Sequence, residues 1–231
     1  MEVSHWVFAK AFVVTVLVLV IIYSLNVFLN SKREISITDD MDASLETMEE
    51  MQALTYLAPL FHDNETCVTL KSQLKLLDTQ TWKLGNKIED YHKLTQEYMS
   101  NPEYYKQKRK FNRQEVMYLS LLRQIRDKCS LNQSIILYFY SNPKKCQQCD
   151  QQAFVLTHLH QKMDQEISIF SFDYDLDLPS VSVLKDVYNV GELPCIVIED
   201  GTYCGLQDKE TIERVLCEKT PYLSICAQAG T

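Results

Sequence analysis

The stretch IILYFYSNPKKCQQC, residues 135–149, leads from an apolar run into two cysteines that are separated by two residues. The apolar run predicts a buried strand, and the chain after the cysteines predicts a helix. A C-x-x-C pair at such a junction is typical of a dithiol that forms and breaks a disulfide, because the helix N-terminus stabilises a thiolate. We therefore expect Cys146, exposed at the start of the helix, to be the attacking thiol. Cys149, one turn further on, would resolve the mixed disulfide.

Two lysines, Lys144 and Lys145, stand directly before the cysteines and are expected to favour the thiolate form. The alternative for a C-x-x-C pair is half of a zinc site, which needs two further ligands at metal spacing. The sequence contains no second C-x-x-C and no H-x-x-x-H. We therefore expect redox chemistry with no metal and no cofactor.

The chain after the cysteines alternates between helical and strand-like segments. The pattern predicts helices at 151–163, 181–188 and 207–217, and strands at 167–172, 195–198 and 202–204. Asp200-Gly201 is a hairpin signal between the last two strands. Pro194 directly precedes a buried strand, where it removes a ladder donor, and this position predicts a cis peptide bond that ends a tight turn.

The chain from Ser134 onward resembles the thioredoxin family. The resemblance rests on the C-x-x-C motif, on the segment VGELP at 190–194, and on the order of the elements. It implies an α/β thioredoxin-like fold for this part, a central mixed sheet flanked by helices. It also implies that the proline loop lies beside the dithiol, with Leu193 and Pro194 binding the backbone of the substrate.

Two features depart from the family pattern and keep two hypotheses open. The residues between the cysteines are the uncharged Gln147 and Gln148, and residues 135–140 contain no acid for proton relay. The leading hypothesis is a thiol–disulfide oxidoreductase that acts on cysteine-containing proteins or on a redox partner protein. The alternative is a non-catalytic thioredoxin-fold binding or scaffold protein, in which Cys146–Cys149 is a structural disulfide.

The segment 11–29 is almost wholly apolar and carries no charge. About 20 such residues cross a bilayer as a helix. A cleaved signal peptide is the alternative, but the run is long for that role and no small-x-small cleavage site follows it. We therefore expect a single-pass transmembrane anchor.

The orientation of this anchor has two conflicting signals. Lys10 precedes the span, whereas Lys32 and Arg33 follow it, which favours a cytoplasmic C-terminus. The cysteine content favours the opposite side, because disulfides persist in oxidising compartments. We follow the cysteines and expect the C-terminal domain to be extracytoplasmic, in a periplasm, an extracellular space or a lumen.

The middle of the chain carries a near-heptad apolar stripe, typical of a coiled coil. Its members are Leu70, Leu74, Leu77, Thr81, Leu84, Ile88 and Tyr91. A capping signal at Ser100-Asn101-Pro102-Glu103 begins a second helix that ends near Lys128. These two helices predict an antiparallel hairpin, in which Cys67 and Cys129 lie together at the open end. We expect a disulfide between them with Cα atoms within roughly 7 Å.

The remaining cysteines also predict local disulfides. Cys195 and Cys204 flank the hairpin turn, and Cys217 and Cys226 flank the end of the last helix. Sequence alone does not fix this connectivity. For Cys195, which is next to Pro194, the alternative is a third redox thiol.

The expected organisation has three parts: an anchor at 1–31, a helical region at 32–132 and a thioredoxin-like domain at 133–231. We expect residues 31–41 to be flexible, and the hairpin and the domain to have separate cores. The basic run KQKRKFNR at 106–113 is either a solvated helix face or a docking surface for acidic groups. A net charge of −8 argues against a nucleic-acid partner. The glycosylation sequons at Asn64 and Asn132 matter only in a host that glycosylates.

Overall fold

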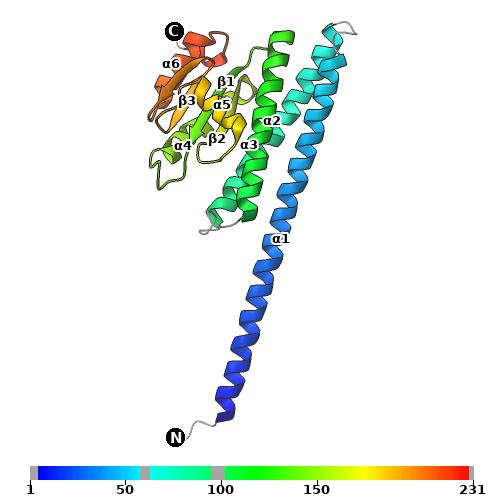
Figure 1. Ribbon diagram of the computed structural model, residues 1–231, viewed down its shortest axis with the longest axis vertical. Coiled ribbons are helices and arrows are strands. Elements are labelled where there is room, and N and C mark those ends of the chain that lie inside the picture. Colours follow the sequence, from blue (N-terminus) through cyan, green and yellow to red (C-terminus); the bar gives the residue numbers. More distant parts are fainter. Residues whose placement is uncertain (1–4, 58–62, 95–101, 229–231) are drawn as a thin grey trace.

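The computed structural model describes residues 5–57, 63–94 and 102–228, in which long helices precede a small sheet region (Figure 1). The helices are α1 (His5–Leu57), α2 (Asp63–Leu94), α3 (Pro102–Cys129), α4 (Cys149–Met163), α5 (Pro179–Val187) and α6 (Lys209–Lys219), with short 3-10 helices η3 (Asp164–Glu166) and η4 (Ser224–Gln228). The strands are β1 (Ser134–Tyr140), β2 (Ile167–Asp173), β3 (Cys195–Ile198) and β4 (Gly201–Cys204). The order of elements after residue 133 is the order that the sequence predicted.

The four strands form one mixed sheet in the order β2-β1-β3-β4. β1 and β2 are parallel, whereas β3 is antiparallel to both β1 and β4. The fully buried apolar run of β1 accounts for its central place, because such strands need cover on both faces. Three segments therefore meet at the edge where β1 ends: the chain after Tyr140, the chain after Asp173 and the chain before Cys195.

Each face of the sheet has its own apolar layer. Alternate residues of β1, such as Ile136 and Tyr138, pack with α4 and α6. The intervening residues, such as Leu137 and Phe139, pack on the opposite face with α3 and α5. This alternation follows from the period of two along a strand.

The segment 31–41, which we expected to be flexible, is instead part of the continuous helix α1. Ile37, Met41, Ser44, Met48 and Met51 are all buried. Their alternating steps of four and three place them on one side of the helix, where they pack against α2 and α3. Methionine and serine make this stripe less apolar than a leucine heptad, which is why the sequence did not reveal it.

The N-terminal part of α1 projects away from the rest of the molecule (Figure 1). Every residue from 6 to 29 is exposed, although most of them are apolar. By length and composition this part of the helix is able to cross a membrane.

Helices α1, α2 and α3 form a three-helix bundle, not a two-helix hairpin alone. A disulfide joins Cys67 to Cys129 with a Cα–Cα distance of 5.5 Å, so the predicted pairing is confirmed. Lys87 of α2 forms an ion pair with Asp40, which ties α2 to α1 near the other end of the bundle.

The bundle and the sheet region share a core, so the expectation of separate cores is wrong. One contiguous cluster contains Met51 of α1, Leu77 of α2 and Leu122 of α3 together with Phe139 and Phe170 of the sheet. The apolar face of α3 covers the sheet directly. The periodicity of α3 predicts an apolar face. It does not predict that a sheet covers this face in addition to another helix.

Polar side chains of α3 also cap the open edge of β2. The Ser171 amide donates to Glu115 Oε1 at 2.8 Å, and the Asp173 amide donates to Asn112 Oδ1 at 2.9 Å. Asn112 Nδ2 in turn donates to the Ser171 carbonyl at 3.3 Å. An edge strand presents unpaired backbone groups, and here the helix satisfies them.

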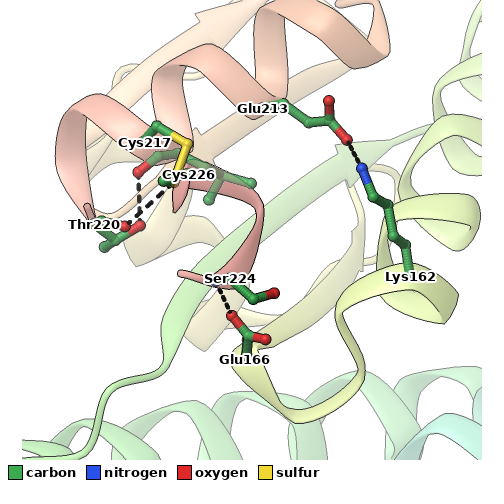
Figure 2. Close-up of a disulfide and its surroundings, with 8 residues drawn as sticks. Lys162, Glu166, Glu213, Cys217, Thr220, Ser224 and Cys226 are labelled. Carbon is green, nitrogen blue, oxygen red and sulfur yellow. Dashed lines mark hydrogen bonds and ion pairs between the residues drawn. A yellow bond between two sulfur atoms is a disulfide. The ribbon is translucent and has the colours of Figure 1, made fainter. Parts of the chain in front are cut away.

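The C-terminal segment closes over α6 (Figure 2). A disulfide joins Cys217 to Cys226, as the spacing predicted, with a Cα–Cα distance of 5.4 Å. The Ser224 amide donates to Glu166 Oε2 at 2.6 Å, which ties η4 to η3. An ion pair at 2.9 Å between Lys162 and Glu213 joins α4 to α6.

Candidate redox site

A disulfide joins Cys146 to Cys149 with a Cα–Cα distance of 5.4 Å, at the edge where β1 ends. Helix α4 begins at Cys149 and not at Cys146, which lies in the preceding turn, where its amide donates to the Asn142 carbonyl. Cys146 is 4% exposed and Cys149 is 2% exposed, so the expectation of an exposed Cys146 is wrong for the oxidised form. The disulfide accounts for this burial, because it binds Cys146 to the buried side chain of Cys149.

The surroundings of the disulfide are nevertheless open. Pro143, Lys144, Lys145, Gln147 and Gln148 are all exposed. No side chain caps the N-terminus of α4, where the Cys149 amide donates to the Cys146 carbonyl, and the positive end of the helix lies beside the disulfide. This arrangement stabilises negative charge on a released thiolate.

The proline loop reaches the same edge from β3. The Leu193–Pro194 peptide bond is cis, as the sequence predicted. Cys195 pairs with Phe139 in the sheet, so Pro194 lies beside the end of the strand that leads to the C-x-x-C loop. The Pro194 carbonyl accepts a hydrogen bond from the Gly205 amide at 2.8 Å, and Gly205 adopts a φ of 80° that suits glycine. Among the hydrogen bonds of the described residues, none engages the backbone of Leu193.

An acid from the neighbouring loop organises the turn before Cys146. Asp175 accepts hydrogen bonds from Ser141 Oγ at 2.6 Å, Asn142 Nδ2 at 3.1 Å and Lys145 Nζ at 2.6 Å. Partial burial opposes ionisation of this carboxyl, but the hydrogen bonds and the charge of Lys145 hold its pKa below the ordinary value. The charge of Lys145 is therefore matched by Asp175, and this lysine biases the thiolate less than the sequence indicated.

Two buried polar side chains, Tyr138 and Gln152, hold α4 beneath the disulfide. The Tyr138 hydroxyl donates to the Cys149 carbonyl at 2.6 Å. Burial raises the pKa of Tyr138, which keeps the hydroxyl protonated as a donor. Gln152 is fully buried and exchanges two hydrogen bonds with the backbone of Gln207. These contacts fix the first turn of α4 against β1 and against the loop after β4.

A buried ion pair from the bundle lies at the same edge. Lys108 of α3 pairs with Asp173, and its ammonium lies 5.0 Å from the ring centroid of Tyr140. Burial opposes the charge of Lys108, but Asp173 raises its pKa, so the lysine is charged. Sequence reasoning missed this pair, because Lys108 appeared only as one member of a basic run far from the cysteines.

Cys195 forms a disulfide with Cys204 across β3 and β4, as the spacing predicted. Its side chain belongs to the core on the α3 side of the sheet, whereas the neighbouring Ile196 faces α4. The bond therefore lies on the face opposite α4, and Cys195 is not a free thiol. Among the described residues, no group of three or more His, Cys, Asp or Glu side chains is arranged to hold a metal ion.

The chain matches no protein-family model and no curated protein. Two solved structures from the malaria parasite are partly similar to it. One, titled only as a malarial protein, is 22% identical, with 38% of this chain and 98% of that chain covered and a TM-score of 0.32. The other, a thioredoxin-2 described as a component of the parasite's protein secretion machinery, is 21% identical, with 38% and 84% covered and a TM-score of 0.33. At these scores the likeness is weak and partial.

Proposed function

We propose that this protein is a membrane-anchored, extracytoplasmic thiol–disulfide oxidoreductase with a thioredoxin-like catalytic domain. The observation that carries the proposal is the meeting of the Cys146–Cys149 disulfide and the Leu193–Pro194 loop at one edge of the sheet. The unpaired backbone of Leu193 would bind an extended substrate segment, and this segment would present a sulfur to the disulfide. The substrates would be cysteine-containing proteins or a redox partner protein.

The reaction would proceed by two exchanges. A substrate thiolate attacks the Cys146 sulfur, the bond to Cys149 breaks, and Cys149 leaves as a thiolate near the positive end of α4. A second substrate thiolate then attacks the substrate sulfur of the mixed disulfide and releases Cys146. The substrate gains a disulfide, and two electrons pass to the Cys146/Cys149 pair. The reverse sequence reduces a substrate disulfide, with Cys146 as the attacking thiolate and Cys149 as the resolving thiol.

Two observations support the location outside the cytoplasm. The exposed apolar part of α1 fits a membrane anchor. All eight cysteines are paired in four disulfides, a pattern typical of proteins in oxidising compartments. Protease added to intact cells should cleave the chain beyond Lys32. Protection until lysis would reverse this orientation.

A measurement of reduction potential tests the proposed activity. The full chain in a lipid nanodisc is equilibrated with glutathione or dithiothreitol buffers, and the Cys146–Cys149 couple is followed by alkylation and mass spectrometry. Exchangers lie between about −120 and −270 mV, whereas structural disulfides lie below about −300 mV. A value in the first range, together with oxidation or reduction of a dithiol peptide, supports the proposal.

The alternative is a binding or scaffold protein in which Cys146–Cys149 only stabilises the loop. The burial of both cysteines and the presence of three other disulfides favour this alternative. It predicts a potential as low as that of Cys217–Cys226, measured in the same sample as an internal control. Cys146→Ser would then lower stability without a loss of any exchange activity.

A further inference from the structure

The redox edge is the end of the sheet that carries Cys146, Cys149 and Pro194. The direction of the strands relative to the bundle determines which way this edge faces. Near the end of α3, Arg126 binds Glu199 at 2.7 Å, and the carboxylate of Glu199 accepts from the Ile135 amide at 2.9 Å, at the start of β1. Near the beginning of α3, Lys108 pairs with Asp173, which lies at the end of β2. β1 and β2 therefore run opposite to α3, and the redox edge lies at the N-terminal end of α3.

That end of α3 lies beside the part of α1 that directly follows the apolar segment. Tyr104 and Phe111 pack in one cluster with Ile37 and Met41. Gln114 Nε2 donates to the Met41 carbonyl at 2.8 Å, so these two residues lie at the same level along the bundle. The redox edge consequently lies at the end of the bundle from which the apolar segment projects (Figure 1).

The height of this edge follows from the rise of the helices. Met41 is about 12 residues beyond Leu29, the end of the apolar run, which corresponds to about 18 Å at the helical rise of 1.5 Å per residue. Lys108 is about six residues before Gln114 in α3. It therefore lies about 9 Å closer to the apolar segment than Gln114 does. The Lys108–Asp173 pair, and with it the redox edge, is thus about 10 Å beyond the end of that segment.

The connection between the apolar segment and the redox edge is rigid. α1 contains neither glycine nor proline and runs without interruption from His5 to Leu57. Helix α3 is joined to α1 by shared apolar packing and by an ion pair at 2.8 Å between Lys110 and Asp42. The same helix is joined to β2 by Asn112 and Glu115. No flexible linker separates the apolar segment from the sheet in this path.

From these observations we infer that α1 is a ruler, a rigid helix that sets the height of the dithiol. It holds the dithiol about 10 Å beyond the end of the apolar segment and facing the bilayer, so that the substrates are integral membrane proteins with cysteines directly outside the bilayer. The inference rests on the proposed function. An extended chain covers about 3.3 Å per residue, so the edge is within reach of cysteines only a few residues beyond a transmembrane segment. A large soluble substrate would have to enter between this edge and the lipid.

The test changes the height of the edge without turning it. Seven helix-forming residues inserted after Asn30 lengthen α1 by about 10.5 Å and rotate the bundle by only about 20°. The insertion variant and the natural chain are placed in nanodiscs with two model substrates. Each is a single-span peptide with a dithiol, carried on a helical stalk of about seven or about 14 residues, which raises it by about 10 or about 21 Å. A water-soluble dithiol peptide is the control.

The natural chain should oxidise the short-stalk substrate roughly tenfold faster than the long-stalk one, and the insertion variant should reverse this preference, because the matched pair has the higher effective concentration. Both proteins should oxidise the soluble peptide at equal rates. If both proteins show the same preference between the short-stalk and the long-stalk substrate, the ruler is overturned. Oxidation of the soluble peptide would still support the redox function. If no substrate exchanges with either protein, whether it is supplied as the dithiol or as the disulfide, the redox function is overturned and the ruler with it.

A second readout measures the geometry without chemistry. A fluorescent non-natural residue in place of the exposed Lys144 reports energy transfer to acceptors on the lipid headgroups. Transfer should be high for the natural chain and clearly lower for the insertion variant. Equal transfer in the two proteins would show that α1 does not set the height, whatever the rates are.

Discussion

At the level of single residues, Cys146 and Cys149 differ in what surrounds them. Cys149 is the first residue of α4, and its carbonyl is held by the Tyr138 hydroxyl. Cys146 lies in a turn between exposed residues. In the reduced protein we predict that Cys146 reacts with iodoacetamide before Cys149, and that Cys149→Ser accumulates mixed disulfides whereas Cys146→Ser does not. Mass spectrometry after limited labelling measures the order, and faster labelling of Cys149 would reverse the assignment.

The stability of the turn before Cys146 depends on pH through the Asp175 carboxyl. Its pKa is lowered in the folded protein, because the hydrogen bonds and charge of Lys145 outweigh partial burial. The stabilisation is therefore complete above the ordinary carboxyl pKa and is lost as pH falls through the lowered value. We predict that Asp175→Asn loosens the turn at neutral pH and makes the reduction of Cys146–Cys149 by dithiothreitol faster.

The control for Asp175→Asn is Asp200→Asn in the β3–β4 turn. This change removes another ion-paired carboxylate, whose partner is Lys219. This control should leave the rate of reduction unchanged. Equal rates for all three proteins would mean that Asp175 does not restrain the turn. Deuterium exchange over residues 141–148 locates the change independently of chemistry.

The residues of the site were predictable to different degrees. The spacing of the cysteines and the position of Pro194 before a strand are local signals, and they located the disulfide and the cis bond. The burial of Cys146 was not predictable, because it depends on how a three-residue turn folds back on α4. Asp175 and Lys108 come from a loop and a helix that only the fold brings to the cysteines, and no local pattern marks them.

At the level of elements, α3 links the bundle to the sheet through the open edge of β2. Glu115 is fully buried, and burial raises its pKa, although the Ser171 amide opposes this shift. A raised carboxyl pKa means that folding binds the proton more tightly, so stability falls as pH rises through the interval between the ordinary and the raised value. Glu115→Gln should remove this dependence on pH and retain an acceptor for Ser171.

A matched change in the same helix tests the edge contact itself. Asn112→Ala removes the partner of the buried Asp173 amide, and an unsatisfied buried donor costs about 1–3 kcal/mol. We predict faster deuterium exchange at the end of β2 in this variant. Gln124→Ala, at an exposed site of α3 with a local contact to Ser120, is the control and should leave β2 unchanged. Unaltered protection of β2 in Asn112→Ala would mean that α3 does not cap the strand.

The elements themselves were predictable where periodicity is strong. Heptad spacing revealed α2, and the alternation of apolar segments revealed the four strands. The second half of α1 was missed, because its buried stripe consists of Ile37, methionines and Ser44, and the acidic residues around them resemble a linker. The shared core was missed because a pattern along one helix does not identify its tertiary partner. Sequence reasoning therefore assigned separate cores to the bundle and the sheet, whereas the structure has one core that both share.

At the level of the whole molecule, the shared core couples the Cys67–Cys129 disulfide of the bundle to the stability of β1, the strand that leads to Cys146. Cys129 packs in the same apolar cluster as Phe139 of β1. The Cys67–Cys129 bond closes a separation of 62 residues, for which the chain-entropy model gives about 4 kcal/mol, an upper value because the helices also pack by themselves. Replacement of both cysteines by serine should therefore lower protection from deuterium exchange in α2, α3 and β1 together.

Cys217→Ser with Cys226→Ser is the matched control, since that bond closes a separation of only nine residues and Cys226 packs on the α6 face of the sheet, opposite the face that packs with α3. The same model gives it about 2.5 kcal/mol. Its loss should expose η4 and the end of α6 first and change the bundle least. If the Cys67/Cys129 variant instead loses protection in α2 and α3 while β1 keeps its own, the bundle and the sheet unfold separately. The edge that carries Cys146 and Cys149 would then not be held rigidly to α1, and its height above the membrane would vary.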